Sequence, residues 1–427
     1  MNKFEKYSSY KDSGVEWLGE IPEHWEVKPL KHLLLKIIDN RGRTPIFGNI
    51  GIPMLEISNI TYGIKSPSNV FSKFVDENIV KHYERDKVKI DDLLISTVGA
   101  TSGKTVIIKE EPNYFIAQNV VGLRVNINVI SDFLFYVLNS SYFYTSLQLI
   151  NKGNTIDSLK VSIFINNICF IPSKEEQTKI ASFLDKKTAQ IDEVISQKEK
   201  LIELLKERKQ IVINDAVTKG LDKNVEFVDS GVEWIGKIPK HWKLERLGSN
   251  FIERREKVSD KDFEPLSVTK NGVVPQLDSA AKSNDGDNRK LVRKGDFVIN
   301  SRSDRKGSSG LSKLDGSVSL INIVLKPIDI NSDFSHILLK SNGFIEEFYR
   351  NGHGIVADLW TTRFWDMKSI MLAIPPKEEQ IQIVEYIENQ TSKIDKTIDL
   401  QQNYISKLKE YKASLIDSLV TGKVRIF

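Results

Sequence analysis

S-G-V-E-W-L-G-E-I-P-E-H-W, Ser13–Trp25, occurs a second time in the same chain as S-G-V-E-W-I-G-K-I-P-K-H-W, Ser230–Trp242. Ten of the thirteen positions are identical, and the two copies lie 217 residues apart. A second pair follows at an offset of 203 residues, with I-P-S-K-E-E-Q at Ile171–Gln177 and I-P-P-K-E-E-Q at Ile374–Gln380. Two landmarks repeated in the same order predict two tandem halves that share one architecture.

A long helical pattern follows each I-P-x-K-E-E-Q motif. Large aliphatic residues recur there at steps of three, four and seven, which places them on one stripe of an α-helix. The stripe contains Ile180, Leu184, Ile191, Ile195, Ile202 and Leu205 in the first half, and Ile383, Ile387, Ile394, Ile398, Ile405 and Leu408 in the second. A single helix cannot bury such a stripe, whereas two matching helices cover each other. We therefore expect an antiparallel, coiled-coil-like pair that serves as a spacer.

The segments between the landmarks, residues 26–170 and 243–373, share little sequence. Both are rich in short β-branched runs separated by Gly, Asn and Ser turns, which predicts mixed β-rich domains. The predicted fold class is α+β, with two β-rich domains separated by two long antiparallel helices in a pseudo-two-fold internal repeat. The predicted segments are 1–25, 26–170 and 171–222 in the first half, and 223–242, 243–373 and 374–427 in the second.

The composition is that of a soluble globular protein with more than one domain, since the chain has 427 residues, 28% charged and 40% hydrophobic. No apolar run approaches the ~18 residues of a membrane span, and the first residues lack the apolar region of a secretion signal. We expect a cytoplasmic protein. The single Cys169 excludes an internal disulfide and is expected to be a small buried hydrophobe. The six His residues show no metal-ligand spacing, so no metal site is expected.

G-A-T-S-G-K-T, Gly99–Thr105, looks like a phosphate-binding loop. The spacing argues against it, because only three residues separate the first Gly from the Gly-Lys pair where a P-loop needs four. The residues that follow are β-branched and predict a strand, whereas a P-loop leads into a helix. The segment is therefore predicted to be a turn between two strands. The matching place in the second half is S-R-S-D-R-K-G-S-S-G, Ser301–Gly310.

These two loops combine hydroxyls, glycines and cations, a composition that suits DNA phosphates and base edges. Between Arg289 and Lys306, seven Lys or Arg face only two Asp, whereas the long helical patterns are neutral or acidic. The alternative for each loop is a solvated turn that binds nothing specific. The candidate DNA-contacting residues are Arg41, Arg43, Thr44, Ser96, Thr97, Thr101, Ser102, Lys104, Gln118, Asn119, Lys270, Asn271, Arg302, Ser303, Arg305, Lys306 and Ser308.

No catalytic signature accompanies these loops. The sequence shows no nucleophile–base pair, no cluster typical of a metal-dependent nuclease and no Gly-rich cofactor loop. The tryptophans of the repeated segments, Trp17, Trp25, Trp234 and Trp242, are expected to be packing anchors and not base-stacking groups. We therefore expect a binding protein that is not an enzyme and carries no cofactor.

The ordered pair of repeats resembles the specificity subunit of type I restriction–modification systems. The residues that carry the resemblance are the S-G-V-E-W and I-P-x-K-E-E-Q pairs, the two helices ending in A-V-T-K-G and L-V-T-G-K, and the loop D-D-L-L-I-S-T-V-G-A-T-S-G-K. The resemblance covers essentially the whole chain.

The resemblance implies that each β-rich domain is a target recognition domain that reads half of a split site in double-stranded DNA. It implies that the helices set the distance between the half-sites and dock two methyltransferase subunits, which motor–nuclease subunits then join. S-adenosylmethionine, Mg and ATP would bind only to those partners, and no membrane is involved. Two alternatives remain, a non-catalytic coiled-coil scaffold whose β domains bind proteins, and an enzyme that acts on DNA alone.

Overall fold

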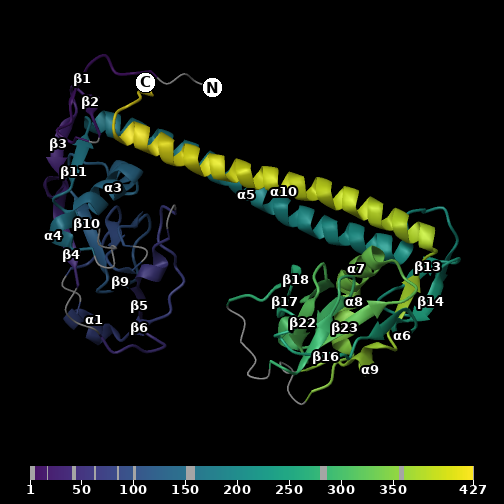
Figure 1. The fold of residues 1–427 in the computed structure, drawn as a ribbon. Helices are drawn as coiled ribbons and strands as arrows, with labels where there is room; N and C mark the ends of the chain where they lie inside the picture. Colours follow the sequence, from purple (N-terminus) through teal and green to yellow (C-terminus); the bar gives the residue numbers. More distant parts are fainter. Residues whose placement is uncertain are drawn as a thin grey trace. The chain divides into compact units, whose positions relative to one another are not determined.

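The computed structural model describes residues 5–16, 18–40, 45–61, 64–83, 86–99, 102–150, 159–278, 286–354 and 360–426. The chain divides into two compact units, unit 1 (residues 1–197 and 403–427) and unit 2 (residues 198–402). Two long helices, α5 (Lys174–Lys219) and α10 (Lys377–Val420), each contribute one half to each unit (Figure 1). The mixed α+β fold with two long helices agrees with the predicted fold class.

Unit 1 is built on an antiparallel sheet of strand order β4-β10-β7-β8, beside a smaller sheet β6-β5-β9 and two strand pairs, β1-β2 and β3-β11. The strands are β1 (Tyr10–Asp12), β2 (Glu20–Pro22), β3 (Glu26–Pro29), β4 (Leu34–Asp39), β5 (Ile52–Leu55), β6 (Phe74–Val75), β7 (Leu93–Ser96), β8 (Thr105–Ile107), β9 (Phe115–Ile116), β10 (Val120–Val125) and β11 (Ile168–Ile171). The shorter helices are η1 (Leu30–Leu33), η2 (Ile57–Asn59), α1 (Glu77–Tyr83), α2 (Ser131–Leu138), α3 (Ser141–Ile150) and α4 (Val161–Phe164).

Unit 2 repeats this plan with an antiparallel sheet of order β15-β23-β20-β21, a sheet β16-β19-β22 and the pairs β17-β18, β12-β13 and β14-β24. The strands are β12 (Phe227–Asp229), β13 (Lys237–Pro239), β14 (Lys243–Arg246), β15 (Phe251–Glu253), β16 (Lys257–Val258), β17 (Leu266–Thr269), β18 (Gly272–Pro275), β19 (Arg289–Val292), β20 (Phe297–Asn300), β21 (Ser309–Leu311), β22 (Gly316–Ser319), β23 (Asn322–Pro327) and β24 (Met371–Ile374). The shorter helices are α6 (Leu247–Asn250), η4 (Ser303–Arg305), α7 (Ser332–Lys340), α8 (Asn342–Arg350) and α9 (Phe364–Met367).

The two central sheets share the same register. Leu93 pairs with Leu123 and Ser96 with Val120 across β7 and β10. In unit 2, Phe297 pairs with Leu325 and Asn300 with Asn322 across β20 and β23. The two central ladders therefore correspond residue by residue, with Ser96 and Val120 of unit 1 at the places of Asn300 and Asn322 in unit 2. The internal repeat predicted from sequence extends through the segments whose sequences have diverged.

The aliphatic stripe of α5 and α10 is buried within each unit, as predicted. In unit 1, Ile180 and Leu184 share a core with Leu415 and Leu419. Unit 2 has the corresponding core, in which Val217 of α5 packs with residues of α10. The remaining stripe residues are buried or half-buried along the helices: Ile191, Ile195, Ile202, Leu205, Ile383, Ile387, Ile394, Ile398, Ile405 and Leu408.

Ion pairs show that the helices run antiparallel within each unit. Asp192 pairs with Lys412 at 2.7 Å in unit 1, where the start of α5 packs on the end of α10. In unit 2, Lys209 pairs with Asp395 at 2.7 Å. Antiparallel pairing is the geometry expected of two matching apolar stripes in one chain.

Cys169 is fully buried in the core of unit 1, as predicted, and its burial raises the pKa of the thiol. Among the helices of the described residues, none has the length and apolar character needed to cross a membrane.

Candidate nucleic-acid interface

The repeated segments contact each other inside each unit. Trp25 Nε1 donates a hydrogen bond of 3.3 Å to Glu176 Oε1, and His24 Nε2 lies 2.9 Å from Glu176 Oε2. The second copy reproduces the arrangement, since Trp242 Nε1 donates to Glu379 Oε2 at 3.0 Å. The H-W of one landmark therefore binds the first residue of the E-Q pair in the other landmark.

The glutamine of each E-Q pair binds backbone groups that precede a short helix. Gln177 accepts a hydrogen bond from Ile130 N at 2.9 Å, next to the first residue of α2. Gln380 accepts one from Asn331 N at 2.8 Å, next to the first residue of α7. Each long helix thus holds the helical part of its β-rich domain in a fixed position, and the repeated motifs have an internal structural role.

The tryptophans behave largely as predicted. Trp25 and Trp242 are buried, and the ring of Trp234 packs edge-on against Phe344 with 6.3 Å between centroids. Trp17, also predicted to be a packing anchor, lies outside the described residues.

The loop of unit 1 that resembled a phosphate-binding loop is a turn between strands β7 and β8, as predicted. Ile95 pairs with Thr105 in an antiparallel ladder, and Gly99 and Gly103 adopt positive φ angles of 74° and 88°. Only glycine takes that conformation without a steric penalty. Since a strand and not a helix follows, the loop has no helix N-terminus with which to hold a phosphate.

Burial contradicts three of the predicted DNA contacts in this loop. The side chain of Ser96 is fully buried in β7, and Thr97 and Ser102 are buried as well. Thr97 Oγ1 donates to the carbonyl of Asn119 at 3.0 Å and holds the loop to the start of β10. Thr97 therefore has a structural role, and burial leaves Ser96 and Ser102 little surface for a contact with a duplex.

The other predicted residues of unit 1 keep some exposure. Gln118 is exposed, and Lys104 and Asn119 are half-buried, so their DNA contacts stay a prediction. Four predicted residues lie outside the described residues: Arg41, Arg43, Thr44 and Thr101.

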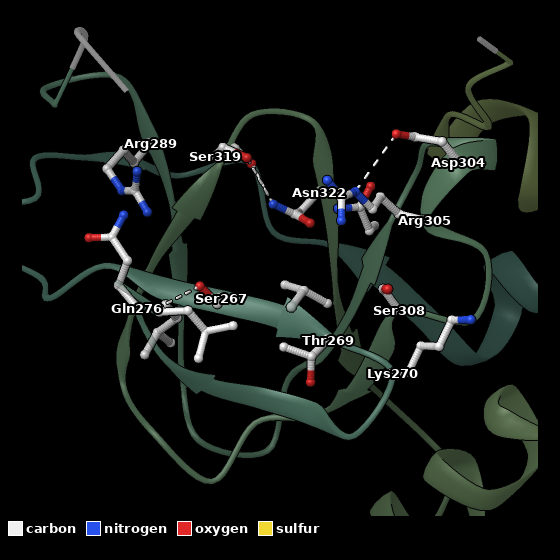
Figure 2. Close-up of a pocket in the computed structure, with 14 residues that line it drawn as sticks. Ser267, Thr269, Lys270, Gln276, Arg289, Asp304, Arg305, Ser308, Ser319 and Asn322 are labelled. Carbon is white, nitrogen blue, oxygen red and sulfur yellow. Dashed lines mark hydrogen bonds and ion pairs between the residues drawn. The ribbon is translucent and has the colours of Figure 1, made fainter. Parts of the chain in front are cut away.

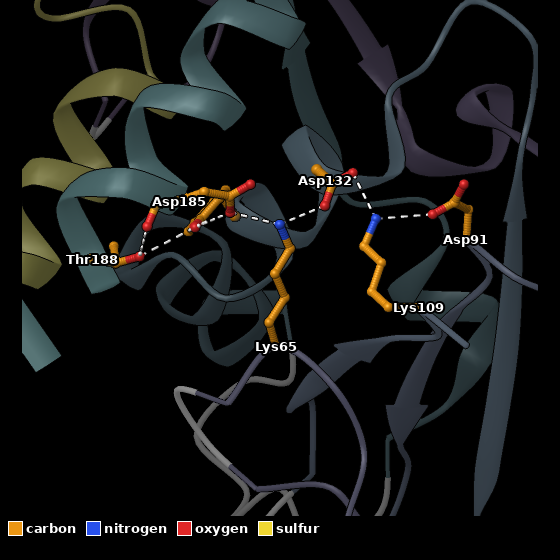
Figure 3. Close-up of polar contacts among 7 residues, drawn as sticks. Lys65, Asp91, Lys109, Asp132, Asp185 and Thr188 are labelled. Atoms are coloured by element: carbon orange, nitrogen blue, oxygen red, sulfur yellow. Dashed lines mark hydrogen bonds and ion pairs between the residues drawn. The ribbon is translucent and has the colours of Figure 1, made fainter. Parts of the chain in front are cut away.

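A cluster of ion pairs fixes the β-rich domain of unit 1 to α5 (Figure 3). Lys65 Nζ lies 2.5 Å from Asp132 of α2 and 2.6 Å from Asp185 of α5. The hydroxyl of Tyr136 donates to the same Asp185 oxygen at 2.6 Å. The carbonyl of Lys65 also accepts a hydrogen bond from Ile107 N at 2.7 Å, at the end of β8. Lys65 therefore positions β8, and with it the β7–β8 loop, relative to the long helix.

In unit 2 the predicted cationic loop is largely neutralised by nearby carboxylates. Arg302 donates two hydrogen bonds to Asp304, at 2.8 and 3.0 Å, and Lys306 pairs with Glu346 at 2.6 Å. The side chain of Arg305 is 67% exposed, and its contact with Asp304 is longer, at 3.7 Å. Arg305 is therefore the cation of this loop that is best placed to meet a phosphate.

The rest of the predicted basic cluster is also engaged. Arg293 pairs with Asp315 at 3.2 Å, and Lys290 pairs with Glu253 at 3.1 Å. Arg289 is buried, donates to Ser317 Oγ at 2.8 Å, and has its pKa lowered by burial. Three of the seven cations between residues 289 and 306 thus pair with acidic residues distant in sequence. The predicted DNA contacts of Arg302, Arg305 and Lys306 stay a prediction.

The β17–β18 hairpin approaches the cationic loop through a lysine that the sequence analysis did not single out. Lys340, near the end of α7, donates to the carbonyls of Lys270 (2.8 Å), Gly307 (3.2 Å) and Ser309 (3.3 Å). In unit 1 the corresponding Asn139 binds the backbone of Thr105. The signal available in the sequence was the weak match of L-N-S with L-K-S in the two halves.

A polar cavity of about 630 Å³ lies between this hairpin and the ends of β20 and β23 (Figure 2). Of the predicted contacts in unit 2, Lys270, Arg305 and Ser308 line it. Ser308 is buried at the wall. Lys270 is exposed at its rim, and Asn271 and Ser303 lie nearby in the sequence but do not line the cavity. The other polar residues of the wall are Ser267, Thr269, Gln276, Arg289, Asn300, Asp304, Ser319 and Asn322.

This wall offers hydrogen-bond donors and acceptors together with a cationic rim. Amides, hydroxyls and guanidinium groups are the side chains that recognise base edges and phosphates. Among the residues that the structure describes, no group of three or more His, Cys, Asp or Glu is placed to hold a metal ion. The polar groups of the wall are suited to hydrogen bonding with a ligand.

Comparisons with known proteins agree on one family. Residues 22–204 match the model described as the type I restriction modification DNA specificity domain. The putative type I restriction enzyme MjaX specificity subunit of Methanocaldococcus jannaschii is 26% identical, over 99% of this chain and 98% of that protein. The EcoKI specificity subunit of Escherichia coli is 23% identical, over 95% and 90%.

Solved structures show the same fold. The HsdS subunit from Thermoanaerobacter tengcongensis matches with a TM-score of 0.56 at 16% identity, over 95% of this chain and 98% of that one. A chain from a structural study of complex assembly and conformational transition in the type I R-M system matches with a TM-score of 0.69 at 14% identity, over 95% and 99%.

Proposed function

We infer that this chain belongs to the specificity subunits of type I restriction–modification systems, and we propose that it reads a bipartite, asymmetric DNA sequence. The observation that carries the proposal is the pair of sheets with identical register and different residues at equivalent places. Ser96 and Val120 in unit 1 stand where unit 2 has Asn300 and Asn322. Equivalent frames with different side chains suit the recognition of two different DNA half-sites.

The near-identical parts of the two halves serve identical partners in this proposal. One methyltransferase subunit docks on each repeat, and restriction subunits join through the methyltransferases. The long helices carry exposed apolar side chains that a partner would cover, Leu201 and Leu204 on α5 and Tyr404 and Tyr411 on α10. A contiguous exposed apolar patch often marks a protein interface.

The chain itself does no chemistry in this proposal. Methyl transfer to adenine takes place on the partner subunit, which also holds S-adenosylmethionine, while ATP and Mg belong to the restriction subunits. The residues of this chain bind DNA, orient it and hold the partners. The polar cavity of unit 2 and the exposed Gln118 of unit 1 are the parts of the described surface best suited to DNA contact.

The test is a genome-wide map of methylated adenines in the host, with and without this chain. Loss of one split, asymmetric motif on deletion is expected. Exchange of residues 243–373 for the corresponding domain of a relative should then change one half of the motif and leave the other half intact.

Two results would overturn the proposal. A motif that changes in both halves, or in neither, would contradict the modular reading of DNA. A copurifying methyltransferase that gives no DNA protection would favour the alternative, a scaffold whose β domains bind proteins.

A further inference from the structure

Asn322 carries a buried acceptor in the wall of the unit 2 cavity. Its side chain is 5% exposed, and among the described residues its Oδ1 has no hydrogen-bond partner. Its Nδ2 donates to Ser319 O at 3.2 Å and to Ser319 Oγ at 3.0 Å. Those two bonds fix the orientation of the amide, because a flipped amide would place Oδ1 against a carbonyl oxygen.

The cavity of unit 2 is where this acceptor points. Asn322 forms part of the wall of the 630 Å³ cavity, and Figure 2 shows its side chain directed into the space beside Arg305 and across from Thr269. An unpaired buried acceptor destabilises the state that contains it. A ligand that donates a hydrogen bond at this point would remove that destabilisation.

Asn300 supplies the complementary donor. It is the cross-strand partner of Asn322 in the β20–β23 ladder, so the two side chains lie on the same face of the sheet, and both line the cavity. The Oδ1 atom of Asn300 accepts a hydrogen bond from Arg302 N at 3.2 Å, which leaves its NH₂ group as the donor it presents. The two amides together present an acceptor beside a donor.

That pattern matches one base edge in the major groove. Adenine offers the N6 amine as a donor beside N7 as an acceptor, whereas guanine offers two acceptors, cytosine one donor, and thymine one acceptor and a methyl group. We propose that Asn322 and Asn300 read an adenine in the half-site bound by unit 2, with Asn322 Oδ1 accepting from the N6 amine and Asn300 Nδ2 donating to N7.

The rim of the cavity supports the same ligand. Lys270 is exposed at the hairpin tip, and the side chain of Arg305 is 67% exposed on the opposite loop. Cations at the edge of a base-reading surface neutralise the phosphates that flank the base. Unit 1 has Ser96 and Val120 at the equivalent positions, both fully buried. Neither side chain carries an amide, so this pair of amides is confined to unit 2.

This inference rests on the proposed function, and the two can fail separately. If deletion of the chain removes no methylated motif, the proposed function fails. If the motif is present but the half-site assigned to unit 2 by exchange of residues 243–373 has no required adenine apart from the methylated one, only the adenine inference fails.

The decisive binding experiment uses the full chain with its methyltransferase. The duplexes carry atomic changes at each required adenine of the unit 2 half-site, apart from the methylated one. One duplex series replaces adenine by purine, which lacks the N6 amine, and another by 7-deazaadenine, which lacks the N7 acceptor. At one position we expect each change to weaken binding about ten-fold, within the range of a specific base contact. If no position shows such a loss, the inference is overturned, and this result needs no protein variant.

The protein side of the experiment assigns the contact to Asn322. Asn322→Ala should bind the natural duplex about ten-fold more weakly and should no longer distinguish adenine from purine at that position. Its control is Ser96→Ala at the equivalent place in unit 1, which should leave discrimination unchanged. Thermal unfolding of both variants checks the fold. Persistent discrimination by a folded Asn322→Ala protein would show that Asn322 has a structural role only.

Discussion

Lys65 Nζ lies 2.6 Å from Asp185 Oδ1, and this ion pair joins the β-rich domain of unit 1 to α5 (Figure 3). The same ammonium group contacts Asp132 at 2.5 Å. Lys65→Met keeps the apolar stem and removes the charge that both carboxylates share. We expect a loss of about 1–2 kcal/mol in the free energy of unfolding, since the pairs are only partly exposed. Urea denaturation measures this loss.

Lys179→Met is the matched control on the same helix, because Lys179 pairs with the exposed Glu175. We expect that change to cost less than about 0.5 kcal/mol. Equal losses in the two variants would show that the Lys65 cluster contributes no more than a surface ion pair.

The same cluster predicts that Lys65→Met unfolds in acid at a higher pH than the parent chain. Burial alone would raise the pKa of Asp132, but hydrogen bonds from Lys65 and Lys109 outweigh burial and hold this pKa below the ordinary 3.8. A lowered carboxyl pKa stabilises the folded state above pH 3.8, and that stability is lost as the pH falls through the lowered value. Lys65→Met should therefore begin to unfold at a higher pH than the parent chain. An acid titration followed by circular dichroism tests this, and identical midpoints would contradict it.

The repeated H-W and E-Q contacts predict that two adjacent glutamates, Glu175 and Glu176, contribute differently to the free energy of unfolding. Glu176 is buried and accepts hydrogen bonds from Trp25 and Tyr7, whereas the side chain of Glu175 is 78% exposed. Glu176→Gln keeps the shape and removes the charge on which these donors converge, so we expect a loss of about 1–3 kcal/mol. Glu175→Gln is the control and should leave the free energy of unfolding nearly unchanged. Calorimetry would contradict the anchoring role if the two variants had the same melting temperature.

His336 predicts that unit 2 loses stability in mild acid. Its Nδ1 accepts a hydrogen bond from Leu311 N at 3.2 Å, and burial, followed by the charge of Lys340, lowers its pKa below 6.5. Asp333 acts in the opposite direction and Lys313 in the same direction as Lys340. The unfolded chain therefore takes up a proton near pH 6.5 while the folded chain stays neutral until lower pH. Stability should be complete above that pH and should decline below it.

His336→Asn separates this effect from other titrations, because an amide oxygen accepts a hydrogen bond and does not titrate between pH 5 and 8. The variant should show a flatter dependence of the urea midpoint on pH between 7 and 5.5. His353→Asn is the control, since the side chain of His353 is 79% exposed. A parent chain whose midpoint is constant over this range would refute the prediction.

Local patterns identified the parts of the fold that depend on periodicity and repetition. The apolar stripes of α5 (Ile180 to Leu205) and α10 (Ile383 to Leu408) could be predicted because helix geometry places residues at steps of three, four and seven on one face. The β7–β8 turn could be predicted from Gly99, Gly103 and the β-branched residues around them. Both features depend only on neighbouring residues.

The parts that were wrong or missed depend on contacts between residues distant in sequence. Arg293 and Lys306 look free in the sequence, and their partners Asp315 and Glu346 come from other elements. Ser96 has a DNA-compatible side chain, yet its place inside the central sheet buries it. Asn322 lies in no recognisable motif. Its importance arises from register with Asn300, which only the folded sheet establishes.

The paired helices lead to a prediction about the unread DNA between the half-sites. Lys198 of α5 donates to Gln401 of α10 at 2.8 Å, so the two helices face each other at these residues. Seven residues inserted after Gln197 and seven after Gln402 keep the apolar stripe in phase, because seven residues are close to two turns. Each insertion adds about 10.5 Å of helix. At 3.4 Å per base pair, the unread gap should lengthen by about three base pairs while both half-sites keep their sequence. Inserting seven residues in α5 alone mismatches the pair and is the control for destabilisation. A methylation map with an unchanged gap in a stable double-insertion chain would show that the helices do not set the spacing.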